Sequence, residues 1–296
     1  MLNNFGQKGI RTGCSSGELA VIVSKGLDHQ ARSDVHGIYF LFRDGYRPSS
    51  EDIYRFISQN PGISISLDPA ERPKLILVAS DDRLVSDGDS ANCPDKNWLE
   101  LLSEGLTFDL AGLAPGPHSP VPAIEHRFDY DESLTNKLDQ SVNIRPGVHI
   151  LEAAGTVPVL KGLLGIARDF IQHFEQVEAV VWPHSASVIG RRFFESTVTA
   201  YLEGGAFPAL GLVALHQSFD GGLQSVGLSH VTGQEFRIEP DLASDKLIAT
   251  RLAVRLINQL VLTGPVERVE ALVAPDGRVI RIEPSPNGPF VRVWGS

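Results

Sequence analysis

Residues 177–240 read VEAVVWPHSASVIGRRFFESTVTAYLEGGAFPALGLVALHQSFDGGLQSVGLSHVTGQEFRIEP, and this segment decides the fold prediction. It begins with an apolar run that ends at Trp182 and continues into a stretch with the apolar spacing of a helix. Two further apolar runs follow, separated by Asp220-Gly221-Gly222, which is the pattern of a β-hairpin. The segment therefore predicts a strand, a helix and a hairpin in one α+β unit.

The residues after this segment predict one long helix and a second hairpin. Apolar side chains recur at helical spacing over residues 242–262. Residues 269–274 and 279–283 are apolar runs on either side of a Pro-Asp-Gly turn, which again indicates a hairpin. We expect residues 290–294 to add an edge strand.

The residues before this segment predict a similar mixture of elements. Short apolar runs predict strands at residues 19–24, 38–42, 63–67, 74–79, 106–110 and 148–153. Helical spacing predicts helices at residues 51–59, 98–102 and 158–174. Ser49 is expected to cap the first of these helices. In the first half of the chain the predicted elements follow the order strand, helix, strand, strand, helix, strand. This is the order of the split βαβ, or ferredoxin-like, group.

We therefore expect an α+β fold of two ferredoxin-like halves, with mostly antiparallel sheets and helices on one face. The segment Pro115–Pro122 is the clearest boundary, because its prolines remove backbone donors and favour an extended chain. The predicted division is a disordered tail at residues 1–17, an N-terminal half at 18–114, a Pro-rich linker and irregular segment at 115–145, and a C-terminal half at 146–296.

The composition indicates a cytoplasmic protein. The longest apolar run is short, whereas a membrane-spanning helix needs roughly 20 apolar residues. The N-terminal residues lack the apolar core of a secretory signal. Two cysteines among 296 residues make no disulfide framework, which favours a reducing compartment. We expect no membrane partner.

The charge balance argues against nucleic acid as a partner. The chain has 26 Lys and Arg against 36 Asp and Glu, a net charge of −10. A general nucleic-acid binder normally presents a basic face, and the longest basic run here is the pair Arg191-Arg192. The partner is therefore expected to be an unknown protein or a small molecule. Exposed sheet edges commonly pair, so a homodimer is also compatible with the predicted fold.

The candidate pocket residues gather at the end of one predicted strand and in the loop before another. Trp182 would form an apolar wall, while His184 and Ser185 would supply polar contacts, since the carboxyl ends of strands commonly hold ligands. Glu235 would act as a general base or cation ligand, with Arg191 beside it. The alternative is that these residues pack and turn the chain, with Glu235 paired to an arginine.

A metal site is a weaker hypothesis. His149, His216 and Glu235 lie on or beside predicted strands, and three such ligands suffice for a catalytic metal ion. Their separations in sequence are large, and no helical or H-x-H spacing links them. We expect no bound cofactor.

Several short motifs stand out in the C-terminal part and just before it. They are Ala179–Ser185, Phe193-Phe194, the strands around Gly211 and Gly227, Gly233–Glu235, the upstream Pro-rich segment Pro115–Pro122 and the strand around His149. Together they resemble an uncharacterised bacterial family, of the kind known as a domain of unknown function. Ala186 departs from the small polar turn expected after the Trp strand. The resemblance implies no activity, because none is assigned to the family.

The sequence leaves two classes of function open. The first is a cytoplasmic binding or interaction protein without a bound cofactor. The second is a small-molecule enzyme, hydrolase-like in chemistry, with its site at the Trp182–Ser185 turn and Glu235. The enzyme hypothesis requires these side chains to converge around one cavity, because acid–base catalysis needs hydrogen-bond reach.

Overall fold

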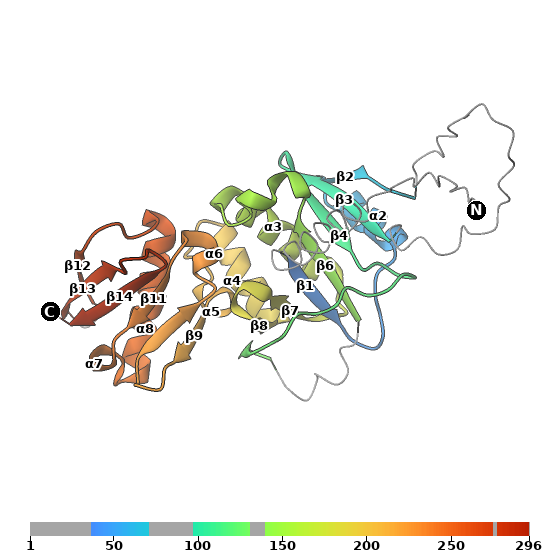
Figure 1. The fold of residues 1–296 in the computed structure, drawn as a ribbon. Coiled ribbons are helices and arrows are strands. Elements are labelled where there is room, and N and C mark those ends of the chain that lie inside the picture. Colours follow the sequence, from blue (N-terminus) through green and yellow to red (C-terminus); the bar gives the residue numbers. More distant parts are fainter. Residues whose placement is uncertain (1–36, 71–96, 131–139, 275–276, 296) are drawn as a thin grey trace, which may run out of the picture.

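The computed structural model describes residues 37–70, 97–130, 140–274 and 277–295, and within these ranges the chain is α+β (Figure 1). Two mostly antiparallel sheets lie at the two ends of the described part, with helices packed against them. None of the described helices combines the length and apolar character that crossing a bilayer requires. The tail and strands predicted within residues 1–36 and at 74–79, and both cysteines, lie outside the described ranges.

The first sheet has eight strands. Their spatial order is β2 (Ile63–Leu67), β3 (Trp98–Ser103), β4 (Leu106–Ala111), β6 (Gln140–Pro146), β1 (Ile38–Phe42), β7 (Val177–Trp182), β8 (Ser187–Gly190) and β5 (His126–Phe128). All neighbours are antiparallel except β5 and β8, which are parallel. β1 lies inside the sheet and all five of its residues are buried. A sequence without polar alternation, IYFLF, suits a strand that is covered on both faces.

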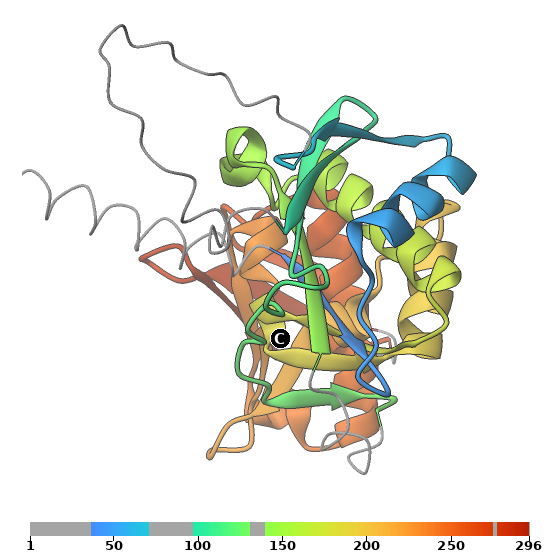
Figure 2. The ribbon, with the colours of Figure 1, turned by 90° about the vertical axis from the view of Figure 1, so that its right-hand side faces the viewer.

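Helices cover one face of this sheet, and an irregular segment crosses the other (Figure 2). The covering helices are α2 (Ser50–Gln59), α3 (Val157–His173) and α4 (Arg191–Leu202). Phe40 of β1 packs on Phe170 of α3, with ring centroids 4.5 Å apart. Tyr39 and Leu41 point to the opposite face, where Ile124 packs against them. Alternate side chains of one strand therefore serve two layers.

The second sheet has six strands and its own long helix. The order is β12 (Glu270–Val273), β13 (Val279–Pro284), β14 (Phe290–Gly295), β11 (Glu235–Ile238), β10 (Leu223–Val226) and β9 (Ala214–Gln217). α8 (Lys246–Thr263) shares a continuous hydrophobic core with this sheet and with the first one. The short helices are α5 (Ala209–Leu212), α6 (Ser229–Thr232) and α7 (Pro240–Ala243).

Capping explains where the helices begin. Ser49 accepts a hydrogen bond from the Asp52 amide while the Asp52 carboxylate accepts from the Ser49 amide, so α2 starts with the predicted cap in the form of a capping box. α8 starts at Lys246 rather than at 242, because the Asp245 carboxylate accepts from the amides of Leu247 and Ile248.

The first sheet crosses the predicted boundary at residues 115–145. The first sheet takes strands from residues 38–190, so it contains parts of both predicted halves. β6 lies between β4 and β1, inside the sheet. β5 forms one edge of the sheet and β2 forms the other. The predicted linker therefore contributes two strands, β5 and β6. The ferredoxin-like arrangement of two halves is not confirmed. β1 pairs with β6 and β7, which are about 100 residues or more away in sequence. Local sequence patterns predict strands but do not predict which strands pair.

Four predicted elements also differ in type or position. The first strand of the predicted hairpin, at residues 209–215, is shorter and shifted, because residues 209–212 form α5 and β9 begins at Ala214. Residues 98–102, predicted as a helix, form β3, because Glu104 and Gly105 take positive φ angles of 50° and 79° and close a two-residue hairpin. Residues 148–153, predicted as a strand, form a 3-10 helix. Residues 290–294, predicted as an edge strand, lie between β13 and β11.

Candidate functional site

Trp182 and His184 lie where the first sheet meets the second. β7 ends at Trp182, which is 1% exposed, and a 3-10 turn, Pro183–Ser185, leads into β8. The Trp182 ring centroid lies 4.9 Å from that of His184. His184 stacks on His230 of α6, with centroids 3.4 Å apart and planes 12° from parallel. This aromatic contact links the two sheets, and His230 joins the predicted residues here.

Glycines allow the loops at this junction to approach closely. Gly227 has a φ of 95°, and a Cβ there would lie 2.9 Å from the His184 carbonyl oxygen. A Cβ at Gly155, before α3, would overlap the His230 carbonyl oxygen. Because any side chain at these two positions meets backbone atoms, glycine is required for the contact.

Glu235 holds the loop at this junction. One carboxylate oxygen accepts from the amides of Gly227, at 2.8 Å, and Ser229, at 2.9 Å. The other accepts from the Ser225 hydroxyl at 2.5 Å and the Leu228 amide at 3.3 Å. The carboxylate therefore anchors the chain from β10 to α6. Both of its oxygens are therefore occupied by hydrogen bonds from the chain itself.

Ser185 and Arg191 also serve the scaffold. The Ser185 hydroxyl is fully buried and lies 2.7 Å from the Ser187 hydroxyl and 3.2 Å from the Gly211 carbonyl oxygen. Arg191 donates to the carbonyl oxygens of Ile171, Phe174 and Val177, at 2.6, 2.8 and 3.0 Å. It caps the end of α3 and holds the start of β7, at the opposite end of that strand from Trp182. Trp182, His184 and Ser185 thus share one turn, Glu235 anchors the loop whose Gly227 packs on that turn, and Arg191 lies at the other end of β7.

The metal hypothesis needs correction. Among the described residues, no group of three His, Cys, Asp or Glu side chains is placed to hold a metal ion. His149 lies in the 3-10 helix before α3, His216 lies on β9, and Glu235 is engaged as above. These three residues therefore do not form the predicted ligand set.

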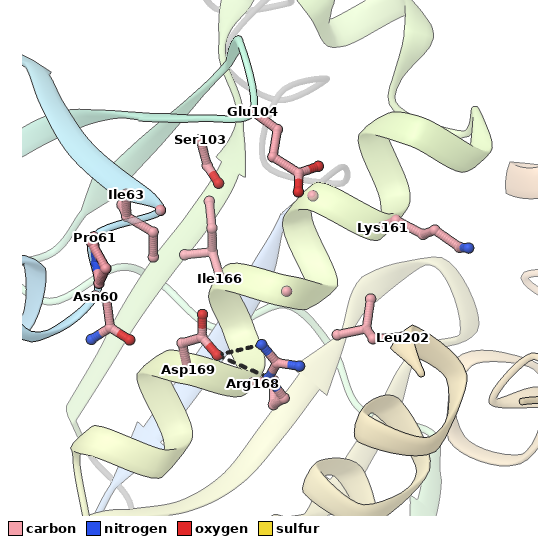
Figure 3. A pocket seen from close by; sticks show the side chains of 13 residues that line it. Asn60, Pro61, Ile63, Ser103, Glu104, Lys161, Ile166, Arg168, Asp169 and Leu202 are labelled. Carbon is pink, nitrogen blue, oxygen red and sulfur yellow. Dashed lines mark hydrogen bonds and ion pairs between the residues drawn. The ribbon is translucent and has the colours of Figure 1, made fainter. Parts of the chain in front are cut away.

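A pocket of about 550 Å³ lies on the outer side of α3 (Figure 3). Its walls are the turn 60–63 before β2, the Ser103-Glu104 end of the β3–β4 hairpin, and Leu202 at the end of α4. Four separate chain segments form this pocket, so no single stretch of sequence contains all of its lining residues. The sequence patterns consequently did not predict this pocket. The available signal was a pair of glycines inside a predicted helix.

The floor of the pocket is the backbone of α3 at Gly162 and Gly165. A Cβ at Gly162 would lie 3.0 Å from the Phe108 ring, so packing accounts for this glycine. A Cβ at Gly165 would meet no atom within 4 Å. A glycine inside a helix costs about 1 kcal/mol relative to alanine. Gly165 therefore lowers the stability of the helix although a larger side chain would fit there. Its absence of a side chain leaves the helix backbone open to the pocket.

Charged side chains surround this floor. Lys161 and Arg168 lie about one turn on either side of Gly165, and the Lys161 ammonium lies 5.2 Å above the Tyr201 ring. Arg168 pairs with Asp169 at 2.7 Å. Figure 3 shows Glu104 and Ser103 reaching over the floor from the hairpin. Within the described ranges, neither Glu104 nor Lys161 has an ion-pair partner.

No family model, curated protein or solved structure matches the chain.

Proposed function

We propose that the protein binds a small zwitterionic molecule, such as an amino acid or a short peptide, in the pocket on α3. The observation that carries the proposal is Gly165, a helix-interior glycine with open space above it at the floor of a charged pocket. The pocket volume of about 550 Å³ is in the range of small-molecule sites. The proposed setting is the cytoplasm, which the low cysteine content supports.

The charges on the two sides of the floor match the two ends of such a ligand. A carboxylate lying over Gly165 has Lys161 and Arg168 on either side along the helix. An ammonium group at the other end faces Glu104 across the pocket. Hydrogen bonds to charged groups contribute about 1.5–3 kcal/mol each, and the missing side chain at 165 lets the ligand approach the helix closely.

Binding has more support than the hydrolase-like alternative. That alternative assigned acid–base chemistry to Glu235 and a polar contact to Ser185. Glu235 accepts three backbone amides and one hydroxyl, and Ser185 is fully buried. Both residues have structural roles that account for their positions.

Calorimetric titration of the full chain with amino acids and dipeptides tests the proposal. We expect Lys161→Met, Glu104→Gln and Gly165→Leu each to lower affinity at least tenfold. The matched control Lys246→Met, on the exposed start of α8, should bind as the wild type does. Amidation of the ligand carboxylate should weaken wild-type binding and leave the Lys161 variant nearly unaffected. Absence of binding by this class, or equal affinity in all variants, refutes the proposal.

A further inference from the structure

The face of the first sheet opposite the helices carries charged side chains in one row. Glu100 of β3 pairs with Asp109 of β4, and Asp109 pairs with Arg145 of β6. Their sequence neighbours Leu99, Phe108 and Ile144 point into the core, so the charged residues face the other way. Three adjacent strands therefore place two carboxylates and a guanidinium side by side.

A hollow of about 310 Å³ lies over this row. Trp98, Asp109 and Arg145 line it from the sheet, while His118 and its proline neighbours line it from the crossing segment. Ser119 fixes that segment, because its amide donates to the Ser141 carbonyl at 3.1 Å and its hydroxyl donates to the Ala111 carbonyl at 3.2 Å. The hollow is thus held between a sheet and a tethered cover.

The charged pair in this hollow is enclosed but loosely joined. The side chains of Asp109 and Arg145 are 17% and 20% exposed, and their contact of 3.4 Å joins the arginine Nε to one carboxylate oxygen. The described residues give the other oxygen of Asp109 no hydrogen-bond donor. Burial raises the pKa of Asp109, against the effect of Arg145, and Glu100 raises it further. An enclosed carboxylate with an unused acceptor is costly for the fold and is typical of binding sites.

We propose that this hollow binds an unphosphorylated sugar of about one ring. Hydroxyls of a sugar are both donors and acceptors, so one of them can donate to the second carboxylate oxygen of Asp109, which lies beside the Arg145 guanidinium. Trp98 and the prolines 117 and 120 supply an apolar wall for the C–H face of the ring. Two carboxylates, Asp109 and Glu100, lie beside one guanidinium, and this excess of negative charge disfavours a phosphorylated ligand.

The roles of the residues follow from their donors and acceptors. The second oxygen of Asp109 accepts one ligand hydroxyl, and the Arg145 guanidinium holds the first oxygen in place. Nδ1 of His118 lies 3.1 Å from the Ser119 carbonyl oxygen, so in the neutral ring this nitrogen carries the proton and Nε2 is the acceptor. The site is separate from the pocket on α3, because it lies on the other face of the sheet.

Ligand-observed NMR of the full chain with neutral hexoses, pentoses and disaccharides tests this site. We expect binding of at least one sugar, a tenfold or greater loss of affinity in Asp109→Asn, and a loss in Trp98→Leu. Glu270→Gln, an equivalent change at the exposed edge of the second sheet, should leave binding unchanged. Circular dichroism verifies that each variant is folded, and Asp109→Asn decides the test if Trp98→Leu unfolds.

Three outcomes overturn the proposal. The first is that no sugar binds, and the second is that Asp109→Asn binds sugars as tightly as the wild type. The third is that free purine bases, rather than sugars, bind in a manner that depends on Asp109 and Trp98.

Discussion

A methyl group at position 165 would meet no neighbouring atom within 4 Å, whereas one at position 162 would lie 3.0 Å from Phe108. Both residues are inside α3, so alanine improves helix propensity equally, by about 1 kcal/mol. We expect Gly165→Ala to raise the free energy of unfolding by about 0.5–1 kcal/mol, and Gly162→Ala to gain less or to lose stability. Urea unfolding of both variants measures the difference. Equal effects would contradict the packing argument.

The end of α3 gives a pH prediction at the scale of elements. His173 is the last residue of α3, and its ring centroid lies 5.3 Å from that of Phe56 in α2. Burial lowers the pKa of His173, and Arg55 lowers it further, although Asp52 acts in the opposite direction. The packing of α2 on α3 therefore favours the neutral ring.

A lowered pKa means that the folded state holds the proton more weakly than the unfolded state. The stability from neutral His173 is present above the ordinary value of about 6.5 and is lost as the pH falls through the lowered folded value. We expect wild type to lose more stability than His173→Phe between pH 7.5 and 5, measured by urea unfolding. Substitution of the exposed His216 by Gln should leave the wild-type slope unchanged. Parallel curves for wild type and His173→Phe would count against the argument.

Local elements were predictable where one segment contains the whole signal. The cap at Ser49, the helix α3 and the strand β7 follow from spacing and capping within a few residues. The same holds for the grouping of Trp182, His184 and Ser185, which are neighbours in the chain. β3 was missed because WLELL has apolar residues at helical spacing, while the deciding turn at Glu104-Gly105 lies beyond it. The pocket on α3 was not predictable, because four separate segments build it.

At the scale of the whole molecule, Glu235 holds the loop through which the second sheet contacts the first. Its carboxylate accepts from three consecutive amides, at residues 227–229, and this loop packs on the turn of His184. We expect Glu235→Ala to lower the free energy of unfolding by about 2–4 kcal/mol, because partly buried amides lose their acceptor. Glu235→Gln should cost less, since one acceptor oxygen remains. Calorimetry with Glu270→Gln as the exposed control measures both, and an unchanged Tm in Glu235→Ala would contradict this role.

β1 is synthesised long before its neighbours in the first sheet. Its partner strands β6 and β7 come from residues 140–146 and 177–182. At roughly 5–20 residues per second, a ribosome needs on the order of ten seconds to travel from β1 to β7. Until then IYFLF lacks both partners, and an unpaired apolar strand can associate with another nascent chain. Arg43-Asp44 directly follows it, and charges next to an apolar strand oppose such association. The strand at the interior of the finished sheet is thus exposed to aggregation while the protein is being made.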